Sequence, residues 1–171
     1  MKRQRKRYQT PSRPWDKQRL EYEKTIVKNF GLKSKREIWK MQAMLRKYRR
    51  LARELIAKYD AAKEKVLKDR LMKLGLITKD ATVDTILGLS IENFLDRRLQ
   101  TVLLKKGFVN TPHQSRQFIA HGHVIIGNRS VKIPSYMVPV DEEDKIVVKL
   151  TPVKKNNASD VNVSTEPTTA N

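Results

Sequence analysis

The polar residues of greatest chemical interest lie in one stretch of the chain without acidic residues. Between Arg97 and Val140 there is no Asp or Glu, and all three histidines of the protein are found there. Within it, Thr111 followed by Pro112 is typical of the start of a helix, which Gly122 would end. Gly127-Asn128 then joins two short runs in the pattern of a tight β-hairpin. A short helix followed by a basic hairpin presents cations and free backbone amides, and this favours binding of a polyanion.

Several side chains of this helix and hairpin are suited to contact phosphate. Basic groups supply charge, while hydroxyl, amide and imidazole groups supply hydrogen bonds. We therefore expect contacts from Thr111, Arg116, Gln117, His121, His123, Asn128, Arg129 and Lys132.

A second basic set lies between Ser34 and Lys58, where Glu37 and Glu54 are the only acids. Salt bridges within the segment cannot account for so many cations, and arginine is suited to bidentate phosphate contact and to stacking on bases. From this segment we expect contacts by Lys35, Arg36, Lys40, Arg46, Lys47, Arg49, Arg50 and Arg53. From the basic arm before it we expect contacts by Arg3, Arg5, Lys6, Arg7 and Arg13.

Catalytic and metal sites find little support in the sequence. His121 and His123 could ligate a metal, but no third ligand lies nearby. The acidic run 141–144 lacks the alternation and the glycine of a calcium loop. The chain has no Cys, no glycine-rich phosphate loop and no serine in a nucleophile-like setting. We expect no enzyme activity, no cofactor and no metal.

The charge balance indicates the class of partner. The 171 residues carry 37 Lys and Arg against 18 Asp and Glu, a net charge of +19. Residues 1–58 hold 20 of these cations and 5 of the acids. So many like charges repel one another in a folded chain, and this indicates a polyanionic partner, either nucleic acid or an anionic membrane surface. No apolar run approaches the ~18 residues of a spanning helix, and no apolar region follows the basic start as in a signal peptide. We therefore expect a soluble, cytoplasmic protein that binds nucleic acid.

Periodicity and capping residues predict the elements that position these side chains. Asp16 and Gly31 would bound a first helix, and Ser34 with Glu37 would form a capping box for a second, long one. Its apolar stripe comprises Ile38, Met41, Leu45, Tyr48, Ala52, Leu55 and Tyr59. Further helices are expected over 61–74, where Val66, Leu67, Leu71 and Leu74 fit a 3.6-residue period, and over 82–87, 90–105 and 111–121. The hairpin spans 124–134, the acids 141–144 form an exposed loop, and 146–150 form a last strand.

These elements predict an α+β protein. Residues 1–15 form an extended basic arm, and residues 16–90 form a helical domain. Residues 91–150 form a small RNA-binding domain of two helices packed on a short, mainly antiparallel sheet. Residues 151–171 lack periodicity, and we expect a disordered tail.

Four segments resemble the archaeal and eukaryotic type of the small-subunit ribosomal protein four family. The arm Tyr8-Gln9-Thr10-Pro11 with Pro14-Trp15 is similar to the start of that family, and residues 31–40 are similar to its first long helix. Arg97-Arg98-Leu99-Gln100-Thr101-Val102, followed by Lys106-Gly107, resembles its middle. Arg116-Gln117-Phe118-Ile119, with His121-Gly122-His123 and Pro134-Ser135-Tyr136, resembles its small RNA-binding module. The resemblance covers residues 4–150. Departures are Ser115, where the family often has Ala, and Gly127-Asn128, where Asn-Gly is common.

The resemblance implies a primary binder of small-subunit ribosomal RNA that joins a multi-helix junction early in assembly of the subunit body and contributes to translational accuracy. It implies contact with neighbouring small-subunit proteins, including number five, near the path by which messenger RNA enters. It adds Arg97, Arg98 and Tyr136 to the expected RNA contacts. Two alternatives remain: an RNA-modifying enzyme with the same module as an accessory, and a free-standing RNA chaperone.

Overall fold

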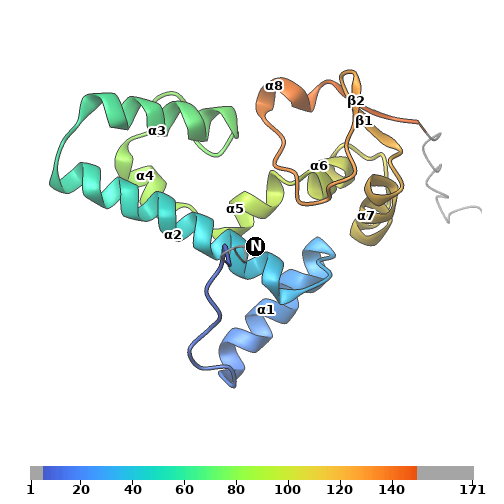
Figure 1. The fold of residues 1–171 in the computed structure, drawn as a ribbon, viewed down its shortest axis with the longest axis horizontal. Helices are drawn as coiled ribbons and strands as arrows, with labels where there is room; N and C mark the ends of the chain where they lie inside the picture. The colour runs from blue at the N-terminus through green and yellow to red at the C-terminus, as the bar shows by residue number, and fades with distance from the viewer. Residues whose placement is uncertain (1–5, 150–171) are drawn as a thin grey trace, which may run out of the picture.

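In the computed structural model, residues 6–149 are described, and they form eight helices and three short strands (Figure 1). Arg3, Arg5, Leu150 and the tail 151–171 lie outside the described residues. The helices are α1 Lys17–Phe30, α2 Lys35–Ala57, α3 Ala61–Lys73, α4 Val83–Gly88, α5 Ile91–Asp96, α6 Leu99–Lys105, α7 Pro112–Ala120 and α8 Val140–Glu143. The strands are β1 Val124–Ile126, β2 Arg129–Ser130 and β3 Ile146–Val148.

The long helix α2 organises a helical lobe, by which we mean residues 17–96. Six of the seven predicted stripe residues are buried, and α2 contacts α1, α3, α4 and α5. Figure 1 shows α3 lying alongside one half of α2 and α1 crossing its other end. This arrangement follows from the amphipathic pattern, since one apolar face is buried and the charged face is left outside.

The first helix is bounded as its sequence predicts, and one buried carboxylate fixes it to α2. The Asp16 side chain caps its start, and Gly31 ends it with a left-handed φ of 57°. Glu23 is fully buried in α1 and accepts a hydrogen bond from Trp39 Nε1 of α2 at 3.0 Å. It also pairs with Arg19 at 2.9 Å and with Lys35 at 3.4 Å. A buried carboxylate needs such partners, because its desolvation is otherwise costly.

A second lobe, which we call the module, comprises residues 97–149. Its sheet has the order β2-β1-β3 and both pairings are antiparallel, with Ile126 opposite Arg129 in the hairpin and Val124 opposite Val148. Residues of α6, α7 and the strands share one apolar cluster, separate from that of the helical lobe. The predicted α+β class is therefore confirmed.

The prediction of one continuous helix over 90–105 is wrong, because the helix is interrupted at Arg97-Arg98 and divided into α5 and α6. Arg98 has an extended backbone (φ −77°, ψ 144°). The break allows the Leu99 N–H to donate to the carbonyl of Tyr136 at 2.8 Å, and the Val138 N–H to that of Arg97 at 2.9 Å. Packing divides at the same place, since Leu95 belongs to the first cluster and Leu99 to the second.

Four smaller expectations also need correction. Tyr59 follows the end of α2 and is exposed, and Val66 is exposed on α3, whereas Leu67 and Leu71 are buried. Asp141, Glu142 and Glu143 lie in the short helix α8 and not in a loop, and Asp144 directly follows its end. Glu37 does not complete a capping box on Ser34, because its Oε1 accepts from the Lys33 N–H at 3.3 Å instead. No helix in the described part of the chain is long and apolar enough to cross a membrane.

Candidate nucleic-acid interface

The charged face of α2 is a basic surface that extends along the helix. Its apolar stripe is buried against the helical lobe, so the opposite side faces solvent. Six of the expected contact residues are exposed on it: Arg36, Lys40, Arg46, Lys47, Arg50 and Arg53. We call these six residues the α2 basic face.

This face keeps most of its positive charge. Arg50 pairs with Glu54 at 3.1 Å, and both side chains remain largely exposed. Exposed ion pairs of this kind contribute little to stability, and the arginine can readily exchange the glutamate for a phosphate. Glu37, the other acid of the segment, is directed toward the module and not toward the face. The face can therefore offer a row of cations to phosphates.

Two further cations of this segment are engaged elsewhere. Arg49 is only half exposed, and its Nη2 donates to the carbonyl of Leu89 at 2.7 Å. Its place follows from spacing, because it lies four residues after Leu45 and three before Ala52, beside the apolar stripe. Lys35 pairs with the buried Glu23. Arg49 is therefore not a freely exposed cation, and its expected contact with phosphate stays a prediction.

The described part of the basic arm lies against the helical lobe. Lys6, Arg7 and Arg13 are exposed, and Tyr8 packs on Trp39 with ring centroids 5.9 Å apart. Arg19 Nη2 donates to the carbonyls of Arg13 and Pro14, each at 2.9 Å. These contacts hold the arm to α1 and α2.

In the module, the start of α7 forms as predicted. The Thr111 hydroxyl accepts from the Gln114 N–H at 3.2 Å, and Pro112 occupies the first turn. Gln117 and His121 are exposed, His123 is half-buried, and the two histidine rings lie 6.1 Å apart. This end of the module offers hydrogen-bonding groups without a compensating carboxylate.

Arg116 and Arg98 have a different role from the one expected of them. Arg98 is 1% exposed, and its Nη2 pairs with Glu37 Oε2 of α2 at 2.5 Å. Arg116 Nη2 lies 2.9 Å from Oε1 of the same carboxylate. Arg98 is thus buried between the lobes, and Arg116 has its charge largely satisfied there, while the expected RNA contacts of both stay predictions.

The electrostatics of Glu37 agree with this geometry. Burial raises the pKa of the Glu37 carboxyl, but the hydrogen bonds and charges of Arg116 and Arg98 outweigh burial and hold the pKa below its ordinary value. Glu37 is thus an ionised bridge between α2, α6 and α7.

Gln100 makes a second bridge between the lobes. Its Nε2 donates to the carbonyls of Phe30 at 3.1 Å, Gly31 at 3.0 Å and Pro112 at 2.8 Å. The buried Ser115, a departure from the common pattern of the family, donates from Oγ to the Gln100 carbonyl at 2.7 Å. Sequence reasoning missed Gln100 and the bridging role of Glu37, because nothing in their local sequence indicates a partner in the other lobe.

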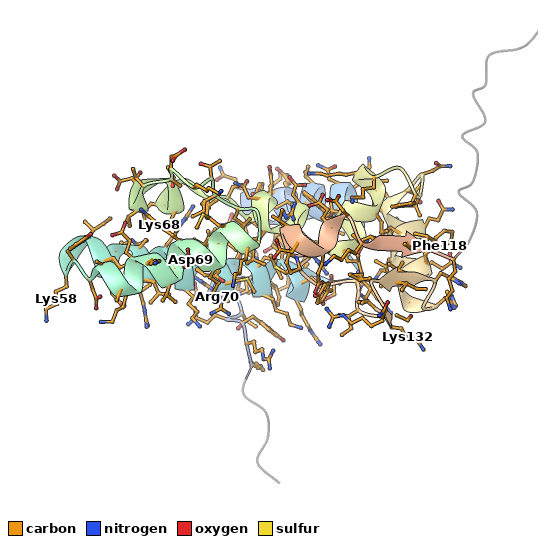
Figure 2. All side chains as sticks on the ribbon, turned by 90° about the horizontal axis from the view of Figure 1, so that it is seen from above. Lys58, Lys68, Asp69, Arg70, Phe118 and Lys132 are labelled. Carbon is orange, nitrogen blue, oxygen red and sulfur yellow. The ribbon has the colours of Figure 1, made fainter. Side chains whose placement is uncertain are left out.

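The hairpin carries cations that α8 partly neutralises. Asn128 and Lys132 are exposed, and Figure 2 shows Lys132 at the end of the molecule remote from Lys58. Arg129 pairs with Glu142 at 3.0 Å and contacts the Tyr136 hydroxyl, which itself donates to Glu142 at 2.6 Å. Burial and the Glu142 carboxylate raise the pKa of Tyr136.

Two acidic residues at the end of α8 pair with two more cations of the module. Arg97 pairs with Glu143 at 2.8 Å, and Lys106 pairs with Asp144 at 3.3 Å. The module is therefore less positive on this side than its acid-free stretch suggests.

Within residues 6–149, no group of three or more His, Cys, Asp or Glu side chains could hold a metal ion. The arrangement can bind a polyanion through the α2 basic face and through the exposed polar groups of α7 and the hairpin. The two lobes present these groups in a fixed relation, because Glu37 and Gln100 join them.

Comparison with known proteins agrees with this architecture. Residues 97–146 match the S4 domain family. The chain is similar to the small ribosomal subunit protein uS4 of Korarchaeum cryptofilum, at 44% identity over 148 residues, which covers 85% of this chain and 89% of that protein. It is 46% identical to uS4 of Saccharolobus solfataricus over 149 residues, which covers 85% of this chain and 82% of that protein. It is also 46% identical to uS4 of Nanoarchaeum equitans over 152 residues, which covers 85% of this chain and 84% of that protein.

These relatives are ribosomal proteins and not enzymes, which confirms the expectation of a non-catalytic protein. They span both lobes, and the S4 domain match begins at Arg97, where the long helix predicted over 90–105 is broken. On the shared length and identity, the chain belongs to the uS4 family of small ribosomal subunit proteins.

Proposed function

We propose that this protein is a structural component of the small ribosomal subunit that binds ribosomal RNA through cations of both lobes. Family membership supports the assignment to the subunit. The α2 basic face carries the RNA-binding part of the proposal, because its cations are exposed and little compensated. RNA helices are recognised mainly through backbone and shape, which suits a row of arginines and lysines.

The proposed contact set follows the exposure of each side chain. It comprises Lys6, Arg7, Arg13, the α2 basic face, Thr111, Gln117, His121, His123, Asn128 and Lys132. Arg129 contributes after exchange of its pair with Glu142 of α8, since an ion pair with an exposed side chain is weak. Arg97 and Tyr136 contribute after exchange of their part-buried contacts with Glu143 and Glu142 of the same helix. Arg98 and Arg116 act by fixing the module to the helical lobe, and Arg49 acts within the helical lobe through the Leu89 carbonyl.

On this basis we infer finer roles. The protein binds a multi-helix junction of the RNA early, nucleates assembly of the subunit body and contributes to accuracy. It lies in the cytoplasm, in the small subunit, beside other small-subunit proteins including number five, near the path by which messenger RNA enters. The two lobes held at one angle support such a role, because a junction is recognised by the relative direction of its helices.

Co-sedimentation tests the assignment. We expect one copy per small subunit in purified subunits after a high-salt wash, because a buried and extensively contacted component is retained. Loss of the protein in the wash, or recovery only with free RNA, would point to an RNA chaperone or an accessory factor. Chemical footprinting on isolated ribosomal RNA tests the junction.

Salt dependence tests the mechanism. Neutralising about 6–10 phosphates weakens binding by about 10³–10⁵ between 50 and 200 mM salt for duplex DNA, and somewhat less for RNA. A titration that is insensitive to salt would exclude cation–phosphate contacts as the main source of affinity.

A further inference from the structure

A groove between α2 and α3 lies beside the α2 basic face but is chemically different from it. It has a volume of about 1280 Å³ and is lined by residues of both helices, together with Arg7 of the arm and Ser135 of the module. Met44 and Leu51 of α2, which are partly buried, and Val66 of α3, which is 68% exposed, lie along it. An apolar floor of aliphatic and thioether side chains that reach the surface is typical of a site that another apolar surface covers.

The edges of the groove are mainly basic, and Glu54, the one acid among the described residues that line it, pairs with Arg50 at 3.1 Å. Lys40 and Lys47 border it from α2, Lys58 from the end of α2, and Arg70 from α3. None of these four cations makes an ion pair within residues 6–149, whereas Lys63 on the same border pairs with Asp60 at 2.8 Å. Figure 2 shows Lys58 at one end of the molecule and Arg70 nearer its middle, along the paired helices. The groove thus combines an apolar floor with unneutralised cations at its edges.

Other parts of the same chain do not complement this groove. Residues 1–5 are Met-Lys-Arg-Gln-Arg and would be repelled by its edges. Residues 151–171 carry two cations and two acids, with no net charge to offer. A second copy would bring another net charge of +19. RNA would satisfy the cations but would leave the methionine, leucine and valine side chains against phosphate and sugar.

We propose that the groove between α2 and α3 receives an acidic amphipathic helix of a partner protein. Helices bind such grooves with apolar anchors at i, i+3 or i+4, and i+7. The 13 residues of α3 extend over about 20 Å at 1.5 Å per residue, so a partner helix of similar length would match the groove. Glutamates flanking the anchors would meet Lys40, Lys47, Lys58 and Arg70.

The test uses the full-length protein and a fluorescein-labelled synthetic peptide of α3 length, with leucines at helical spacing and glutamates elsewhere. A peptide of identical composition with the leucines dispersed around the helix is the control for charge. Fluorescence anisotropy at physiological salt should detect binding of the first peptide and at least about tenfold weaker binding of the second, as expected when the apolar anchors no longer share one face.

Two pairs of variants locate the binding site. Val66→Ser should weaken peptide binding about tenfold, whereas Ile56→Ser should not, because Ile56 is 56% exposed but does not line the groove. Lys58→Glu with Arg70→Glu should abolish binding, whereas Arg46→Glu with Arg53→Glu, the same charge change outside the groove, should retain most of it. All six substituted residues are exposed, so circular dichroism should show an unchanged fold.

Equal binding of the two peptides would overturn the proposal, as would equal effects of Val66→Ser and Ile56→Ser. If Val66→Ser instead weakens binding of ribosomal RNA, the groove is an RNA surface and the proposal is wrong. Each outcome leaves the ribosomal assignment untouched, since co-sedimentation with the subunit is measured separately.

Discussion

Arg116 of α7 and Glu37 of α2 are 79 residues apart in the sequence, yet only 2.9 Å separates Nη2 of the arginine from Oε1 of the glutamate. Arg98 binds the other oxygen of the same carboxylate. Two arginines that were expected to contact RNA are thus used to fix the module on the helical lobe. The angle between the two basic surfaces depends on this carboxylate and on Gln100.

Glu37→Gln should destabilise the protein by about 3–5 kcal/mol, because it leaves the buried Arg98 without its counter-charge. Urea unfolding measures the change. Glu54→Gln is the matched control. Because the Arg50–Glu54 pair is exposed, its loss should lower the free energy of unfolding by less than about 1 kcal/mol. Equal effects of the two substitutions would show that the Glu37 bridge contributes little.

Acid should remove the contribution of Glu37. Its folded-state pKa lies below the ordinary value of 4.5, so the unfolded chain binds more protons in the range just below that value. The stabilisation is therefore present above about pH 4.5 and is lost as the pH falls through the folded-state pKa. The difference in Tm between the native protein and Glu37→Gln should shrink from pH 7 to pH 3. A constant difference would contradict the lowered pKa.

Gly31→Ala should disturb the contact between the lobes. A Cβ there would lie 2.6 Å from Cβ of Pro112, and φ is +57°. The left-handed backbone costs about 1–2 kcal/mol, and the overlap adds about 1–3 kcal/mol. Gly107→Ala, at φ +75° with no atom within 4 Å, should show the backbone cost alone. Thermal unfolding of both variants separates the two effects, and equal losses would argue against tight packing at Pro112.

Substitutions on α2 should separate RNA binding from stability. Arg46→Ala with Arg53→Ala should weaken RNA binding and reduce the salt slope, with little change in unfolding, since both side chains are exposed. Arg49→Ala should instead cost about 1–3 kcal/mol of stability, because the Leu89 carbonyl loses its donor. Filter binding and urea unfolding of the same samples test this division, which a stability loss in the first variant would contradict.

The sequence by itself determined the local features of this protein. Asp16, Ser34 and Thr111 cap helices because their side chains accept from the next free amides, and the α2 stripe is buried because its spacing puts it on one face. The predicted hairpin and the basic character of α2 are local as well. The α2 basic face was therefore accessible to prediction.

Only the tertiary structure decided which cations are free. Arg49, Arg97, Arg98, Arg116 and Arg129 meet a carbonyl or carboxylate between 13 and 79 residues away. No periodicity encodes such a partner, because charge is a property of a residue, whereas neutralisation depends on what the fold brings within hydrogen-bonding distance. The break at Arg97-Arg98 belongs to the same class, since it is stabilised by hydrogen bonds to the segment around Tyr136 and Val138 and not by its own sequence.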